Sequence, residues 1–270
     1  AWTGSLTPSI LYLQVIWAIG LSMLALALLH RLPLPLLGAI GIVIVGGHNA
    51  LAGVSFEPGS LGAATWTVLE QRGMLAEGAL RIKVSYPVLA WIGVILLGYA
   101  CGPLYARSMP AAARRRSLVF AGAACLLMLV ALRATNLYGE PLPWSVQDGA
   151  LRTAMSVLNF TKYPPSLDFI LLTLGAGLLV LAAAEQRDNA FTRIAAVFGG
   201  APMFYYLLHL YALLVLQRIA AAVLGVARAD LGAVWQVWAL TALLAAALYW
   251  PTRRFGRYKR ESGKAWVRYF

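Results

Sequence analysis

The sequence predicts an all-α, polytopic helical membrane bundle, and three observations lead to this prediction. Of the 270 residues, 61% are hydrophobic and only 12% are charged, whereas a soluble domain carries about 25% charged residues. Seven apolar runs are long enough to cross the roughly 30 Å hydrocarbon layer as helices. None of these runs alternates with the period of two that a barrel strand requires, so helices are the structure that remains. A water-soluble globule is excluded.

The seven predicted membrane helices follow one another with connections of very different length. They lie near residues 9–29, 34–53, 88–106, 117–136, 167–184, 201–224 and 233–250. Residues 1–250 are predicted to form one transmembrane domain, and residues 251–270 a basic cytoplasmic tail. Gly98 and Gly102 in the third run have the small-xxx-small spacing of close helix packing.

The distribution of basic residues predicts the orientation of the chain. Lys and Arg outnumber Asp and Glu by 22 to 10, for a net charge of +12. Because most of them separate apolar runs, the expected partner is the lipid bilayer and no nucleic acid is expected. Fourteen lie on the side of connection 107–116 and the tail, which the positive-inside rule places in the cytoplasm. Six lie on the other side: Arg72, Arg81, Lys83, Arg152, Lys162 and Arg228. Ala1 is therefore expected outside the cytoplasm.

This orientation makes the two longest connections, 54–87 and 137–166, exoplasmic. Connections of this length in a compact bundle are usually functional or disordered. In the second, Val146, Leu151, Met155 and Leu158 recur at helical spacing, which predicts a short interfacial helix within 144–158. Cys101 and Cys125 lie inside apolar runs without metal-ligand spacing, so neither a disulfide framework nor a zinc site is predicted.

Polar residues at membrane depth need a partner or a function, because each costs about 2.5 kcal/mol or more. His48 and Asn49 follow Gly46-Gly47 near the outer end of the second helix. They are either site residues or a hydrogen-bonded packing pair. Arg133 lies at the outer end of the fourth helix, and Asp168 at the start of the fifth. A Ser cap and the helix dipole explain Asp168 without a function, and an Arg133–Asp168 ion pair is a third alternative.

Most of these polar residues share a depth in the membrane, although they have no common spacing in the sequence. Seven polar residues lie at the exoplasmic ends of the helices or just beyond them: His48, Asn49, Arg133, Asn136, Asn159, Lys162 and Asp168. Together they predict a polar outward-facing cavity. His209 is different, because it lies about 12 Å along the sixth helix from the cytoplasmic end. Two explanations of His209 remain: a hydrogen bond to a neighbouring helix, and a role in proton transfer.

The string Asn159-Phe-Thr-Lys-Tyr-Pro-Pro-Ser-Leu-Asp-Phe169 resembles bacterial members of the heparan-alpha-glucosaminide N-acetyltransferase catalytic-domain family, within the wider group of transmembrane acyltransferases. The resemblance continues in five further stretches: Leu13-Gln14 to Gly20, Gly47-His48-Asn49, Tyr86-Pro87 to Tyr99, Arg133 to Tyr138, and Pro202 to His209. It extends over nearly the whole chain.

The resemblance implies an integral enzyme of the bacterial inner membrane. It implies transfer of an acetyl group from cytoplasmic acetyl-CoA, as co-substrate, to a sugar or amino sugar on the exoplasmic side. About ten helices are expected in the full-length family, with an upstream Asp-His motif that carries the presumed catalytic histidine. Because no residues here match that motif, we expect this chain to be N-terminally incomplete.

The resemblance also suggests roles for single residues. Acetyl transfer needs a base and donors for the oxyanion. His48 or His209 is a candidate base, and the candidate substrate-binding residues are Asn49, Arg133, Asn136, Asn159, Lys162, Tyr163 and Asp168. No metal is expected, and a homo-oligomer is left open. Two alternatives from other classes remain, a transporter of a small polar solute and a non-catalytic membrane assembly subunit.

Overall fold

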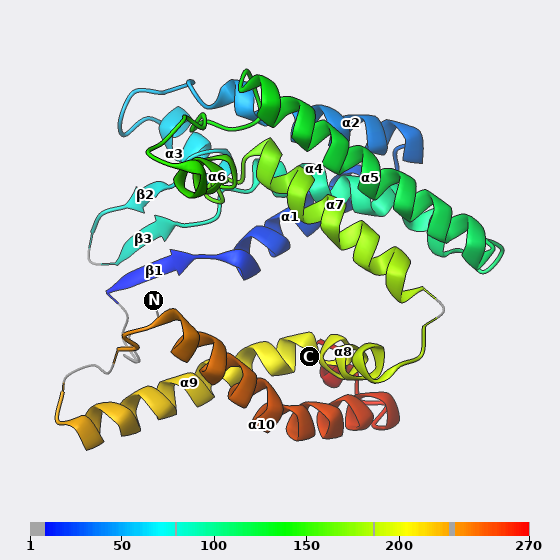
Figure 1. The fold of residues 1–270 in the computed structure, drawn as a ribbon, viewed down its shortest axis with the longest axis vertical. Helices are drawn as coiled ribbons and strands as arrows, with labels where there is room; N and C mark the ends of the chain where they lie inside the picture. Colours follow the sequence, from blue (N-terminus) through cyan, green and yellow to red (C-terminus); the bar gives the residue numbers. More distant parts are fainter. Residues whose placement is uncertain (1–8, 79, 186, 227–229, 270) are drawn as a thin grey trace. The chain divides into compact units, whose positions relative to one another are not determined.

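The computed structural model describes residues 9–78, 80–185, 187–226 and 230–269 (Figure 1). The expectations for Ala1 and Arg228 lie outside these residues. The chain divides into two compact units, Ala1–Glu185 and Gln186–Phe270. We call them unit 1 and unit 2 and describe each by itself.

Unit 1 combines helices with one small sheet. In chain order its elements are β1 (Ile10–Leu13), α1 (Val15–Leu29), α2 (Leu34–Gly47), the 3-10 helix η1 (His48–Leu51), α3 (Leu61–Leu69), β2 (Gly73–Ala76), β3 (Arg81–Val84), α4 (Leu89–Ala100), the 3-10 helix η2 (Gly102–Tyr105), α5 (Ala111–Thr135), α6 (Ala150–Val157) and α7 (Leu167–Ala184). Helices α2 and α4 pack together, as do α5 and α7. Figure 1 shows α3, α6 and the three strands at one end of these helices. This end is the predicted exoplasmic one.

Glycines bring the helices of each pair into close contact. A Cβ on Gly41 of α2 would lie 3.0 Å from the carbonyl oxygen of Gly93 in α4. A Cβ on Gly122 of α5 would likewise lie 3.0 Å from the carbonyl oxygen of Gly175 in α7. Small residues at such crossings let the backbones of membrane helices approach. The predicted packing role of Gly98 and Gly102 is not seen, because no atom lies within 4 Å of a Cβ built at either position.

The three-stranded sheet has the order β1-β3-β2. Strand β3 pairs in parallel with β1 and antiparallel with β2. The sheet was not predicted, because Ile10–Leu13 is continuously apolar and resembles the start of the first membrane helix. Tertiary pairing with Arg81–Val84, from the connection 54–87, decides its conformation. As a result α1 has 15 residues, fewer than the predicted run.

Five helical segments are long and apolar enough to cross a membrane, and they are Leu34–Leu51, Ala111–Thr135, Leu167–Ala184, Pro202–Leu224 and Val234–Glu261. Together with the dominant helical content, they confirm the all-α membrane bundle. The other two predicted spans are the shorter apolar helices α1 and α4. The predicted interfacial helix is present as α6, and its Leu151 and Met155 side chains are exposed.

Unit 2 contains α8 (Ala190–Gly200), α9 (Pro202–Leu224), α10 (Val234–Glu261) and the 3-10 helix η3 (Ala265–Tyr269). Helix α10 packs against α8 and α9, and the rings of Phe204 and Phe255 stack with centroids 4.2 Å apart. Helix α8 was not predicted, and a capping box between Asn189 and Thr192 starts it. The first part of the predicted basic tail continues α10 as far as Glu261.

Two glycines of α7 give a matched test of the α5–α7 contact. A Cβ on Gly175 would lie 2.9 Å from Leu126, whereas a Cβ on Gly177 would meet no atom within 4 Å. We expect Gly175→Ala to destabilise the protein by about 1–3 kcal/mol through overpacking. Gly177→Ala is expected to stabilise it by up to about 1 kcal/mol, since alanine favours a helix. Thermal unfolding in detergent measures both changes, and equal stability of the two variants would contradict this packing.

Candidate functional site

The first turn of α7 is buried, and its backbone N–H groups find partners in three different segments. The N–H of Leu167 donates to Oδ1 of Asn49 at 2.7 Å. The N–H of Asp168 donates to the carbonyl oxygen of Gly139 at 3.0 Å. The N–H of Phe169 donates to the side chain of Ser166, the helix cap, at 3.0 Å. These bonds satisfy groups that every helix start leaves open, and they join η1 and the loop after α5 to α7.

Arg133 supplies hydrogen-bond donors to the backbone carbonyls at the end of α6. It is buried, and its guanidinium donates to the carbonyl oxygens of Val157, Ser156 and Asn159 at 2.8, 3.0 and 2.9 Å. These carbonyls lie at or just beyond the C-terminus of α6, where a helix leaves carbonyl oxygens open, and that of Ser156 also accepts the N–H of Asn159 at 3.3 Å. Its Nη1 atom lies 3.9 Å from Oδ2 of Asp168, so the predicted ion pair is present at long range.

Glu140 fastens the loop between α6 and α7. Its carboxylate accepts hydrogen bonds from the backbone N–H of Thr161 at 2.9 Å and from the hydroxyl of Ser166 at 2.8 Å. The hydroxyl of Thr161 donates to it as well. The loop therefore has a fixed path from α6 to α7, and sequence analysis had not singled out Glu140.

The best-enclosed cavity described in this region, which we call the outer pocket, lies beside the first turn of α7. Its volume is about 270 Å³, and it is lined by His48, Asn49, Ala52, Glu70, Gln71, Arg72, Pro141, Pro164 and Pro165. These residues come from η1, the end of α3 and the two long connections. The structure thus brings His48 and Asn49 to one cavity with part of the string from Asn159 to Phe169.

Both ring nitrogens of His48 face carbonyl oxygens. Nδ1 lies 3.0 Å from the oxygen of Val45, and Nε2 lies 2.8 Å from the oxygen of Pro165. A neutral imidazole has one donor and one acceptor, so only the doubly protonated ring donates to both oxygens. In either state the ring is engaged with backbone and holds Pro165 against η1. The geometry therefore supports a positioning role for His48 more directly than a role as base.

Asn49 keeps two donors for a ligand. Its Oδ1 accepts the Leu167 N–H at 2.7 Å. Because the NH₂ group of an amide cannot accept a hydrogen bond, this contact fixes which way the amide is oriented. The Nδ2 group is thereby left on a side chain that lines the outer pocket. An amide at this position can donate hydrogen bonds to a polar ligand.

The sequence placed Arg72 on the exoplasmic side, but it marked neither Glu70 nor Arg72 as a candidate site residue. Glu70 is only 3% exposed, and burial raises the pKa of its carboxyl to about 7. Arg72 is exposed, and its guanidinium lies 5.2 Å from the ring centre of Tyr163. Nothing in the sequence distinguishes Glu70 from Glu57 in the same connection, since tertiary contacts alone bury it.

Tyr163 and Lys162 lie next to the outer pocket but do not line it. The Tyr163 hydroxyl shares a 2.7 Å hydrogen bond with the hydroxyl of Tyr86. Burial raises the pKa of Tyr163, but the bond with Tyr86 and the neighbouring cations Lys162 and Arg72 outweigh it, and the pKa falls below its ordinary value. Lys162 is exposed, with its ammonium 5.1 Å from the Tyr163 ring centre.

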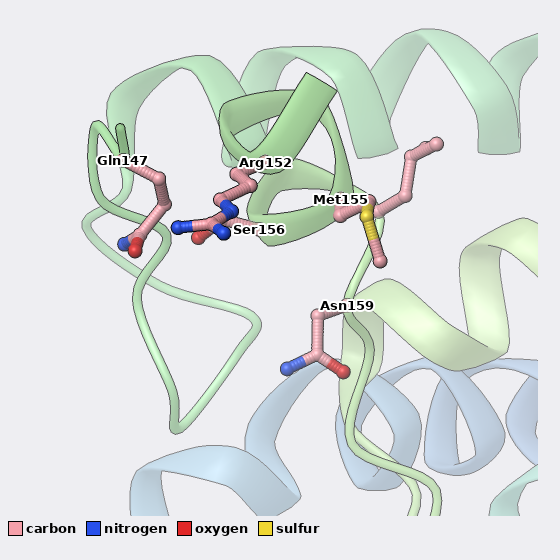
Figure 2. Close-up of a pocket in the computed structure, with 6 residues that line it drawn as sticks. Gln147, Arg152, Met155, Ser156 and Asn159 are labelled. Carbon is pink, nitrogen blue, oxygen red and sulfur yellow. The ribbon is translucent and has the colours of Figure 1, made fainter. Parts of the chain in front are cut away.

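Asn136 and Asn159 lie elsewhere. Asn136 ends α5 with a positive φ, and its amide exchanges hydrogen bonds with the backbone of Trp144. Asn159 lines a second, open cavity of about 630 Å³ together with Gln147, Arg152, Met155, Ser156 and Leu158. Figure 2 shows that these side chains come from α6 and the segments on either side of it.

His209 belongs to α9 in unit 2. Its Nδ1 lies 3.1 Å from the carbonyl oxygen of Tyr205 in the preceding turn, and its ring stacks on the Tyr205 ring. Local packing thus accounts for His209, and its proposed role as a base stays a prediction. Among the residues that the structure describes, no group of three or more His, Cys, Asp or Glu side chains is arranged to hold a metal ion.

Gly139 and Gly149 test how tightly the start of α7 is packed. Both have φ near +100°, so alanine costs about 1–3 kcal/mol of backbone strain at each position. Only at Gly139 would the new Cβ overlap another group, the Asp168 carboxylate. We therefore expect Gly139→Ala to lower the unfolding temperature more than Gly149→Ala does. Equal losses in the two variants would show that the start of α7 has room to rearrange.

Comparison with known families supports the resemblance read from the sequence. Residues 3–132, just under half of the chain, match the family model for the catalytic domain of heparan-alpha-glucosaminide N-acetyltransferase. The match includes His48, Asn49 and Glu70, while the string from Asn159 to Phe169 lies beyond it. No curated protein and no solved structure matches the chain. Over residues 3–132, the chain is therefore similar to the catalytic-domain family of heparan-alpha-glucosaminide N-acetyltransferase.

Proposed function

We propose that the protein is an integral membrane acetyltransferase of the bacterial inner membrane. It moves an acetyl group from acetyl-CoA, bound from the cytoplasm, to a sugar or amino sugar on the exoplasmic side. The family match supports the membrane acetyltransferase class. The distribution of basic residues supports the assignment of sides and a cytoplasmic C-terminus.

The outer pocket is the observation that carries this proposal. Its volume of about 270 Å³ lies just below the usual range of about 300–1,000 Å³ for small-molecule sites, so it suits a single sugar ring. Its walls offer the amide donors of Asn49, the guanidinium of Arg72 and the carboxylate of Glu70. Sugar hydroxyls and amines need this mixture of donors and acceptors.

The reaction requires two kinds of group from the protein, a base and hydrogen-bond donors. The acceptor nitrogen or oxygen attacks the acetyl carbonyl carbon, the bond from this carbon to sulfur breaks, and CoA leaves as a thiolate that takes up a proton. A base removes the acceptor proton, and donors stabilise the oxyanion. The Nδ2 group of Asn49 is the best-placed described donor for the oxyanion, because its orientation is fixed by Leu167.

Asn49→Asp separates the positioning role of this side chain from its role as donor. Aspartate still accepts the Leu167 N–H, but it has no amide donors and adds a negative charge. We expect the acetylation rate to fall by about 10²–10³, the usual cost of losing one oxyanion donor. Gln147→Glu makes the same change of an amide to a carboxylate in the second cavity, and its rate should match that of the wild type.

The assay uses inverted inner-membrane vesicles that contain the protein and enclose glucosamine. Radiolabelled acetyl-CoA is added outside, at the former cytoplasmic face. The proposal predicts labelled N-acetylglucosamine inside the vesicles. An undiminished rate for Asn49→Asp would contradict the role of Asn49. Exchange of unacetylated glucosamine across the membrane, without labelling, would instead identify a transporter.

A further inference from the structure

Glu70 is a buried carboxylate at the wall of the outer pocket. It ends α3 and is 3% exposed, so water gives its side chain little solvation. In the part of the chain that the structure describes, its carboxylate has neither a hydrogen-bond donor nor an ion-pair partner. An ionised carboxylate is costly in such a place unless a cation or donors accompany it. The fold therefore leaves room for a positive partner that it does not itself supply.

Apart from the Asn49 amide, which carries no charge, the polar side chains near Glu70 are engaged with other groups. The His48 ring faces two backbone carbonyls. The Tyr138 hydroxyl donates to the carbonyl oxygen of Gly46 at 2.6 Å, and the Gln71 amide donates to that of Val54 at 3.1 Å. The Arg72 guanidinium lies over the Tyr163 ring. What is missing at Glu70 is therefore a cation that enters with the ligand.

We propose that Glu70 determines the specificity of the outer pocket, by binding the protonated amine of the acceptor and then accepting its proton. This inference rests on the proposed function and refines it. The carboxylate takes one proton from R–NH₃⁺ and becomes a carboxylic acid, which leaves R–NH₂ with a free electron pair. That pair attacks the acetyl carbon as the bond to sulfur breaks. The nitrogen then loses its second proton, which the departing CoA thiolate takes up, and the proton on Glu70 passes to water after the product leaves. A neutral hydroxyl acceptor gains no ion pair in this site.

The titration of Glu70 fits this role. Burial raises the pKa of its carboxyl from its ordinary value near 4.5 to about 7. A group that must take a proton and release it near neutral pH works best with a pKa in that range. The charged and titratable neighbours on the adjoining segments are His48, Arg72 and Tyr138.

The raised pKa also makes a prediction for stability that needs no substrate. A carboxyl whose pKa is higher in the folded state than in the unfolded state stabilises the fold at low pH. That contribution is lost as the pH rises from about 4.5 through about 7. Glutamine does not ionise, so Glu70→Gln should not lose stability over this pH range. Its unfolding temperature should therefore exceed that of the wild type at pH 8 but not at pH 4.5. Glu57→Gln, at an exposed position of the same connection, should leave the pH profile unchanged.

Binding of glucosamine and of glucose to the protein in lipid nanodiscs, without acetyl-CoA, tests the proposal. The two sugars differ at one position, where glucosamine carries an amine and glucose a hydroxyl. Isothermal titration at pH 7.5 should show wild-type protein and Glu57→Gln preferring glucosamine by at least about tenfold, or about 1.4 kcal/mol. Glu70→Gln should lose this preference, and Glu70→Asp should keep part of it.

The outcomes separate this inference from the proposed function. Equal affinity of the wild type for the two sugars, or a full preference in Glu70→Gln, would overturn the role of Glu70. An amine preference that depends on Glu70, in a protein that never acetylates glucosamine, would keep the ammonium site and refute the acetyltransferase. If Glu70→Gln acetylates glucosamine at the wild-type rate, the acetyltransferase function is kept and the role of Glu70 is refuted.

Discussion

The buried start of α7 requires a partner for each of its free backbone N–H groups, and the outer end of unit 1 is organised around this requirement. Asn49, the carbonyl oxygen of Gly139 and the Ser166 side chain supply these partners from three separate segments. A buried N–H without a partner costs about 1–3 kcal/mol, so the three bonds hold η1 and the two ends of the connection 137–166 in register with α7. The outer pocket is the space that remains between the segments thus fixed.

This arrangement divides the polar residues into two groups. Arg133 and His48 direct their polar atoms at backbone carbonyls and so hold α6 and Pro165 in place. The Nδ2 group of Asn49 and the carboxylate of Glu70 stay with the cavity and are available to a ligand. Asn49 belongs to both groups, because its Oδ1 accepts the Leu167 N–H and its side chain lines the cavity. Depth in the membrane therefore marks the region of the cavity, while hydrogen bonding decides which of its residues remain free to bind a ligand.

The sequence predicted those features that depend on composition and local periodicity. Apolar runs gave the membrane helices, helical spacing gave α6, and the shared depth of polar residues led to the region around His48, Asn49 and Asp168. Features created by distant contacts were missed. Ile10–Leu13 becomes a strand only through pairing with β3, and Glu70 becomes buried only when η1 and the two connections meet. Gly93 and Gly175 act at helix crossings that no sequence spacing within one helix reveals.

The central claim is that the outer pocket is the acceptor site, and a structure determined with glucosamine bound in lipid nanodiscs tests it most directly. The account predicts one sugar between Asn49, Glu70 and Pro165. Its amine should lie about 2.7–2.9 Å from a carboxylate oxygen of Glu70, as in a charge-assisted hydrogen bond. A sugar bound instead in the open cavity beside Arg152 and Asn159, with the outer pocket unoccupied, would contradict the account.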